Sequence, residues 1–109
     1  MTKIIPDCFW SDSANGAYVS HEAVCVLNPY EEVTVNLTLY FEDRPPLGGC
    51  AVTVPGQRTK HIRMDLLFGD VIPRATSYAI AVECDHDLAV QYTRVDTTQP
   101  QLTIATTII

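Results

Sequence analysis

The sequence has no long apolar segment, because its longest unbroken apolar runs contain only five residues. A bilayer-spanning helix needs about 20 such residues. The start of the chain also lacks the apolar stretch of about 7 to 15 residues that a secretory signal peptide requires. We therefore expect a cytoplasmic protein that does not cross a membrane.

Positive charge is scarce: 7 Lys and Arg stand against 13 Asp and Glu, which gives a net charge of −6. The molecule as a whole is repelled by nucleic acid and by anionic lipid, so nucleic acid is a disfavoured partner. Any polyanion site would have to be local.

Motifs of catalysis and metal binding are also missing. There is no Gly-x-Ser-x-Gly, no phosphate-binding glycine loop and no Cys-x-x-Cys pair. Histidines 21, 61 and 86 have no i, i+2 or i+4 spacing, so a metal site would need tertiary convergence. We expect no enzymatic activity, no cofactor and no metal.

The four cysteines are widely spaced, and three of them fall in apolar, strand-like segments. We predict reduced thiols that pack as small hydrophobic side chains, with a disulfide as the alternative. These residues are Cys8, Cys25, Cys50 and Cys84.

What the sequence does contain favours β-structure. Val, Ile and Thr account for 31 of the 109 residues, against 24 for Ala, Leu, Glu and Lys together, and β-branched side chains are enriched in strands. A chain of this length forms one domain. We assign residues 1–109 to a single domain.

Hydrophobic patterning places the strands. We predict a strand buried on both faces over residues 23–27 and an alternating, half-exposed strand over 32–41. Residues 42–49 form a loop, a helical turn around 66–68 ends at Gly69, and residues 85–87 join two strands as a hairpin. Further strands are expected over residues 50–54, 58–64, 77–84, 88–95 and 102–109. This pattern is typical of an antiparallel immunoglobulin-like β-sandwich of about seven to eight strands.

The N-terminal segment is expected to be irregular, and Trp10 within it to be buried in the core rather than free to stack on a sugar. At the other end, the final strand finishes in Ile108 and Ile109. An exposed apolar edge invites pairing with another chain. We therefore predict a homo-oligomer.

Cationic side chains gather at Arg58, Lys60, His61 and Arg63. Alternation along a strand puts Thr59, His61 and Arg63 on one face, where imidazole and guanidinium groups would meet the same polar ligand. The alternative is a solvated edge strand kept soluble by its charge.

A second polar stretch runs from Gln91 to Asp96. Gln91 and Thr93 share one face and can reach into a pocket, whereas Arg94 and Asp96 share the other. For these two, an ion pair that fastens the strand end is favoured over ligand contact.

Ser20-His21-Glu22 precedes the first buried strand. Adjacent strand residues point to opposite faces, so His21 and Glu22 do not form a catalytic dyad. We expect His21 to have a structural hydrogen-bonding role, with ligand binding as the alternative.

Four segments together resemble one known family. They are Ser20-His21-Glu22 leading into Val24-Cys25-Val26-Leu27-Asn28, Val54-Pro55 followed by Arg58 to Arg63, Ile72-Pro73, and Gln91 to Asp96. In order and rough spacing the chain resembles the Anabaena sensory rhodopsin transducer family. The resemblance implies a cytoplasmic β-sandwich that assembles as a homotetramer and has no established catalytic activity.

The resemblance also implies partners. In the photosensory member the partner is the cytoplasmic face of a membrane photoreceptor, and small molecules, carbohydrates among them, as well as DNA have been suggested for relatives. The residues that match the family's polar motifs, and so form the predicted ligand site, are His21, Arg58, Thr59, His61, Arg63, Gln91, Thr93, Arg94 and Asp96.

The function that the sequence favours is a non-enzymatic signalling or sensing module that binds a small polar molecule near His61 and Arg63. A protein-interaction adaptor that docks on a membrane receptor is the alternative. A DNA-binding regulator comes third, because the net charge supplies little attraction for phosphate.

Overall fold

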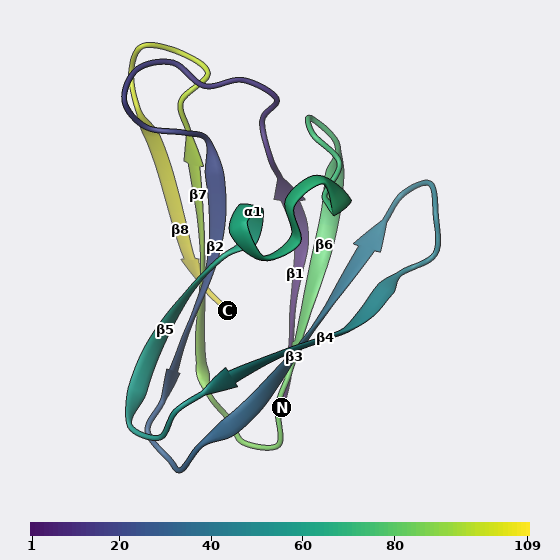
Figure 1. Cartoon of the computed structure of the whole chain (residues 1–109), viewed down its shortest axis with the longest axis vertical. Coiled ribbons are helices and arrows are strands. Elements are labelled where there is room, and N and C mark those ends of the chain that lie inside the picture. Colours follow the sequence, from purple (N-terminus) through teal and green to yellow (C-terminus); the bar gives the residue numbers. More distant parts are fainter.

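The computed structural model describes all 109 residues and contains eight strands and one short helix (Figure 1). The helix, α1 (Met64–Phe68), and a 3-10 turn, η1 (Gly69–Val71), lie between β5 and β6. The strands are β1 (Thr2–Phe9), β2 (His21–Asn28), β3 (Val33–Phe41), β4 (Leu47–Val54), β5 (Arg58–Arg63), β6 (Ser77–Glu83), β7 (Ala89–Asp96) and β8 (Thr103–Ile108).

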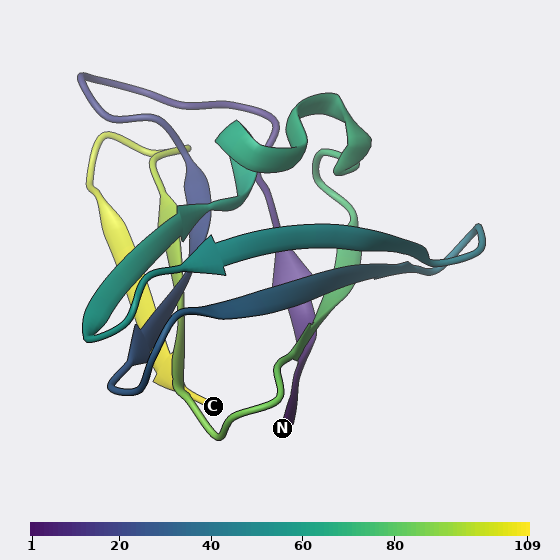
Figure 2. The ribbon, with the colours of Figure 1, turned by 60° about the horizontal axis from the view of Figure 1, so that its bottom comes forward.

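The strands form two four-stranded antiparallel sheets that pack face to face. The first sheet has the order β1-β6-β3-β4 and the second has the order β5-β2-β7-β8. The predicted antiparallel β-sandwich is confirmed. Two hairpins, β3–β4 and β7–β8, stay within a sheet, and every other connection crosses to the opposite sheet (Figure 2).

The predicted hairpin at residues 85–87 is wrong. β6 pairs with β1 and β3, whereas β7 pairs with β2 and β8, so this connection crosses between the sheets. A short polar link can reverse within a sheet or cross the gap of about 10 Å between packed sheets, and its composition does not tell the two apart. Here the His86 ring stacks on Tyr30 with ring centroids 5.0 Å apart.

The core follows the alternation of the sequence. In β3, Val33, Val35, Leu37 and Leu39 are buried as predicted, and the last two oppose Val82 and Ile80 across the first sheet. The prediction that β2 is buried on both faces holds only in part, because on its outer side Ala23 is 1% exposed whereas Leu27 is 47% exposed. No further layer covers the second sheet at that residue.

The N-terminal segment, predicted to be irregular, instead forms an edge strand. β1 pairs with β6, and its register shifts between Ile5 and Cys8. Pro6 lies in this irregularity, where the missing N–H of proline costs no ladder hydrogen bond. The proline therefore weakens the strand pattern in the sequence, but the strand still forms.

The loop predicted over residues 42–49 is shorter than expected, since β4 begins at Leu47. Gly48 and Gly49 together oppose Thr38 between two regular pairs, which makes a β-bulge. Gly49 has φ of +80°, a conformation that glycine adopts without a steric penalty. Glycine therefore allows the strand to continue here.

The predicted helical turn is confirmed as α1, and Gly69 ends it with φ of +56°. Met64, expected at the end of a strand, instead begins this helix and is buried. Trp10 is buried as expected, with 7% of its surface exposed. None of the helices has the length and apolar character needed to span a bilayer.

All four cysteines are free thiols. Cys8 and Cys84 are buried, as predicted, whereas Cys25 and Cys50 are only partly buried. The partial exposure of Cys25 follows from the open outer face of β2.

Candidate functional site

The outer face of the second sheet brings the two polar stretches of the sequence together. Cys25 on β2 lies in register between His61 on β5 and Gln91 on β7. In the next row, Ala23 lies between Arg63 and Thr93. Strands in a sheet lie about 4.8 Å apart, so His61 and Gln91 are separated by about 10 Å.

A shallow hollow lies on this face. Its volume is about 240 Å³, and its lining consists of Cys25, Val26, Leu27, Thr59, Ala89, Val90, Gln91 and Ile108. The Cys25 Sγ atom lies 3.0 Å from His61 Nδ1. Burial raises the pKa of the Cys25 thiol, so the thiol stays protonated beside the ring nitrogen. His61 is therefore held at the edge of the hollow.

Three of the nine predicted site residues lie away from this face. Arg58 lies at the start of β5, where its guanidinium donates to the carbonyl of Gln57. Arg94 and Asp96 project from the opposite side of β7, as alternation requires. The predicted ligand site is therefore not one continuous surface.

The predicted ion pair between Arg94 and Asp96 is wrong. Arg94 donates to the Asp7 carbonyl oxygen at 3.2 Å, while Asp96 accepts hydrogen bonds from Ser11 and Thr98. The bonds from Thr98 hold the pKa of the Asp96 carboxyl below its usual range. Arg94 is thus bound to β1, and Asp96 is bound to Ser11 and to Thr98, two residues further along the chain.

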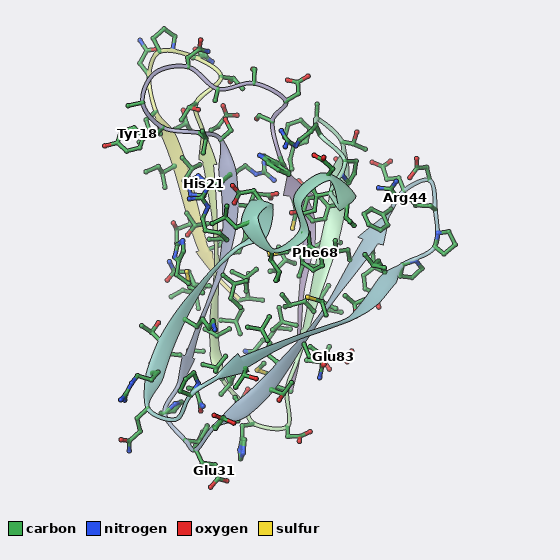
Figure 3. All side chains as sticks on the ribbon, in the orientation of Figure 1. Tyr18, His21, Glu31, Arg44, Phe68 and Glu83 are labelled. Atoms are coloured by element: carbon green, nitrogen blue, oxygen red, sulfur yellow. The ribbon has the colours of Figure 1, made fainter.

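His21 occupies the outer side of β2, at the end of the sheet where α1 lies (Figure 3). Its Nδ1 atom lies 2.8 Å from the carbonyl oxygen of Val19. Glu22, the next residue, is fully buried between the sheets. The two side chains point to opposite faces, as predicted.

Glu22 forms a buried hydrogen-bond network that was not predicted from the sequence. Its carboxylate accepts hydrogen bonds from the hydroxyl of Tyr78 at 2.6 Å, from the hydroxyl of Tyr92 and from the backbone N–H of Phe9 at 2.9 Å. Burial, reinforced by the charge of Glu22, raises the pKa of both tyrosines, so their hydroxyls stay protonated and donate. The sequence does contain one sign of this burial: Glu22 lies two and four residues before Val24 and Val26, so it points to the same inward side of the strand.

A second concave region, the end pocket, lies where the β1–β2 connection passes α1. Its volume is about 280 Å³, and its walls combine an aromatic ring, hydroxyls and charged groups. It is lined by Trp10, Ser11, Asp12, Ser13, Ala14, Val19, Ser20, Asp65 and Arg74. None of these residues was among the predicted ligand contacts.

One predicted residue borders this pocket through an ion pair. Arg63 donates to both carboxylate oxygens of Asp65, at 2.8 and 2.6 Å. Burial alone would raise the pKa of Asp65, but the hydrogen bonds and charge of Arg63 outweigh it and hold that pKa below its usual range. Asp65 therefore remains ionised, and the positive charge of Arg63 balances its negative charge.

Replacing Arg63 with alanine will lower the stability of the fold near neutral pH more than it does in acid. A carboxyl whose folded pKa is depressed stabilises the fold above its unfolded pKa of about 3.9 and loses that contribution as the pH falls through its folded pKa. The variant will therefore unfold at a lower temperature near neutral pH, and its gap from the native protein will narrow below about pH 4.

Thermal unfolding between about pH 2 and 7 measures this gap. Arg58→Ala is the matched control, because Arg58 is exposed and donates only to its neighbour Gln57. A gap that stays constant over the whole pH range would contradict the assigned ion pair.

Comparisons with known proteins agree with this architecture. The family model described as Anabaena sensory rhodopsin transducer matches residues 2–109. The crystal structure of Thermotoga maritima 1070 is similar with a TM-score of 0.87 and 30% identity over 98% of this chain and 90% of that one.

The structure titled Anabaena sensory rhodopsin transducer is similar with a TM-score of 0.75 and 35% identity, over 91% of this chain and 90% of that one. A search among curated proteins found no match. The family match spans nearly the whole chain and agrees with both structural matches, so this protein belongs to the Anabaena sensory rhodopsin transducer family.

Proposed function

We propose that this protein is a non-enzymatic, cytoplasmic signalling module that binds a small polar molecule on the outer face of the second sheet. The observation that supports the proposal is the shared face of His61, Arg63, Gln91 and Thr93 beside a hollow. Their imidazole, guanidinium, amide and hydroxyl groups suit a molecule rich in hydroxyl or carboxylate groups, such as a sugar or a small organic acid.

Two of these residues are the principal contacts. Arg63 is already engaged by Asp65, and the Thr93 hydroxyl lies 3.0 Å from that of Thr106. His61 and Gln91 keep polar atoms free for a ligand. We therefore expect these two side chains to contribute most of the polar binding.

Thermal unfolding with a panel of monosaccharides and small organic acids tests this proposal. A ligand present at 100 times its dissociation constant adds about 2.7 kcal/mol of stability. The double variant His61→Ala, Gln91→Ala will lose this stabilisation. Lys60→Ala is the control, because Lys60 lies on the same strand but alternates to its other side.

Equal stabilisation of the native protein and the double variant would reject this site. The absence of stabilisation by every compound in the panel would reject small-molecule binding on this face.

We also propose that the protein assembles as a homo-oligomer, a tetramer as in the family, with β8 in the interface. β8 is an edge strand whose six residues are all exposed, and Ile108 is 79% exposed. An unpaired apolar edge favours association.

Ile108→Lys will reduce the mass measured by light scattering, whereas Thr107→Lys, on the other side of β8, will reduce it less. An unchanged mass for Ile108→Lys would exclude β8 from the interface.

A groove between the edge strands β4 and β5 favours a second candidate function, an adaptor that docks on a membrane receptor. Lys60 spans the groove and donates to the carbonyl of Thr53 at 3.2 Å, and Leu66 beside it is 75% exposed. The lining contains no acidic residue, although the chain carries a net charge of −6; it consists of Ala51, Val52, Thr53, Lys60, His61, Ile62, Arg63, Leu66 and Leu67.

This chemistry suits an acidic segment with an apolar side chain. The double variant Lys60→Glu, Leu66→Ser will weaken the binding of acidic peptides from receptor cytoplasmic loops, measured by fluorescence anisotropy. Binding that is equally tight to the double variant would exclude this groove as the docking surface.

A further inference from the structure

The end pocket holds an arginine in an unusual setting. The Arg74 guanidinium carbon lies 3.3 Å from the centroid of the Trp10 ring, so the cation covers the face of the indole. Trp10 is itself fixed, because its Nε1 donates to the carbonyl of Ser20 at 2.8 Å. The ring is thus a rigid support for the guanidinium group.

The backbone next to Arg74 is also constrained. The N–H of Ala75 donates to the Trp10 carbonyl at 2.7 Å, which ties this segment to the end of β1. Ala75 has φ of +51°, in the left-handed region that non-glycine residues seldom occupy. Residues held in such conformations cluster at ligand-binding and active sites.

The donors of Arg74 are not used by the protein. Of the five arginines, it alone donates no side-chain hydrogen bond, whereas Arg44, Arg58, Arg63 and Arg94 each have an acceptor. Its nearest carboxylate, Asp70, is 3.9 Å away and fully solvated. A guanidinium fork with free N–H groups matches the geometry of a carboxylate or phosphate.

The charge of the pocket does not cancel that of Arg74. Asp65 is neutralised by the two hydrogen bonds from Arg63, and Asp12 is exposed, where water screens it. Of the serine hydroxyls in the lining, those of Ser11 and Ser20 are already engaged by Asp96 and by Ser13 and Thr97. Arg74 is therefore an exposed cation of this pocket whose carboxylate partner, the solvated Asp70, lies 3.9 Å away, beyond hydrogen-bond distance.

We propose that the end pocket binds a small molecule that carries an oxyanion, a carboxylate or a phosphate, which accepts paired hydrogen bonds from the Arg74 guanidinium group. This site is separate from the outer face of the second sheet and does not depend on the function proposed above. The indole of Trp10 holds the plane of the fork, and the volume of about 280 Å³ limits the ligand to a small metabolite.

Trp10 is the only tryptophan, so its fluorescence reports on this pocket alone. The native protein will be titrated with inorganic phosphate and with succinate, each against sodium chloride at the same ionic strength. We expect a saturable change in fluorescence with phosphate, with succinate or with both, and none with chloride. The two arms distinguish a phosphate ligand from a carboxylate ligand.

Variants assign the effect to the guanidinium fork. Arg74→Lys keeps the charge but cannot form paired hydrogen bonds, so binding will weaken by about tenfold. Arg74→Ala will abolish binding, measured by calorimetry because this change also alters the fluorescence baseline. Arg44→Ala, which removes another arginine that lies over an aromatic ring, will bind as the native protein does.

The double variant His61→Ala, Gln91→Ala will also retain this binding, which separates the end pocket from the outer face. Three results would each overturn the proposal. They are the absence of a saturable fluorescence change with either anion, the same change with chloride, and undiminished binding to Arg74→Lys and Arg74→Ala.

Discussion

Replacing Glu22 with alanine will lower the free energy of unfolding by about 3 to 5 kcal/mol. The carboxylate joins the two sheets, because it accepts from Phe9 and Tyr78 in the first sheet and from Tyr92 beside it in the second. Alanine would leave two buried hydroxyls and one partly buried N–H without an acceptor, and each buried group of this kind costs about 1 to 3 kcal/mol. Chemical denaturation measures the loss.

Two further variants show that the loss comes from this network. Glu83→Ala removes an exposed glutamate and will change stability by less than about 0.5 kcal/mol. Tyr78→Phe will cost much less in the Glu22→Ala background than in the native protein, because its hydroxyl has then already lost its acceptor. Additive costs for the two changes would contradict the assigned hydrogen bonds.

The second large effect is expected at Asn28. This side chain is fully buried, and its Nδ2 donates to the carbonyls of Glu31, Val54 and Pro55 at 2.7, 3.2 and 3.2 Å. It thereby joins the β2–β3 and β4–β5 turns. Asn28→Asp preserves the shape but places a carboxylate against three carbonyl oxygens, and will cost about 4 kcal/mol or more near neutral pH.

The pH dependence of this variant identifies the cause. The buried carboxyl keeps the N–H of Tyr30 as a donor but faces the carbonyl oxygens, so its folded pKa lies above its unfolded value of about 3.9. Its destabilisation is therefore greatest at high pH and is relieved as the pH falls through the folded pKa. Asn36→Asp, at an exposed site, will show little effect. A loss for Asn28→Asp that does not diminish in acid would contradict charge burial.

The turn beside Asn28 contains a contact between two segments that the sequence does not predict. Pro55-Gly56 predicts a turn, but a side chain at Gly56 would lie 2.8 Å from the carbonyl oxygen of Tyr30. The N–H of Gln57 donates to that same oxygen. The glycine is required by a neighbouring segment as well as by the turn itself.

The candidate site was likewise predictable from the sequence only in part. Alternation correctly placed His61 with Arg63 and Gln91 with Thr93, because a strand side chain has only two directions. The adjacency of β5 and β7 to β2, which brings these pairs onto one face, depends on sheet order. The partners of Arg94 and Asp96 were predicted wrongly, because Asp7, which is distant in sequence, binds Arg94, while distant Ser11 and nearby Thr98 bind Asp96.

The order of apolar and polar residues was by itself sufficient to determine the β-sandwich, most strand positions, the helix that ends at Gly69 and the side of the sheet on which the alternating residues of β3, β5 and β7 lie. Only the tertiary structure decided that β6 and β7 lie in different sheets, that Glu22 joins those sheets and that Arg74 covers Trp10. The physical reason is the range of the interactions. Patterning acts between neighbours along the chain, whereas strand partners, buried hydrogen bonds and pockets form between segments that meet only when the whole core packs.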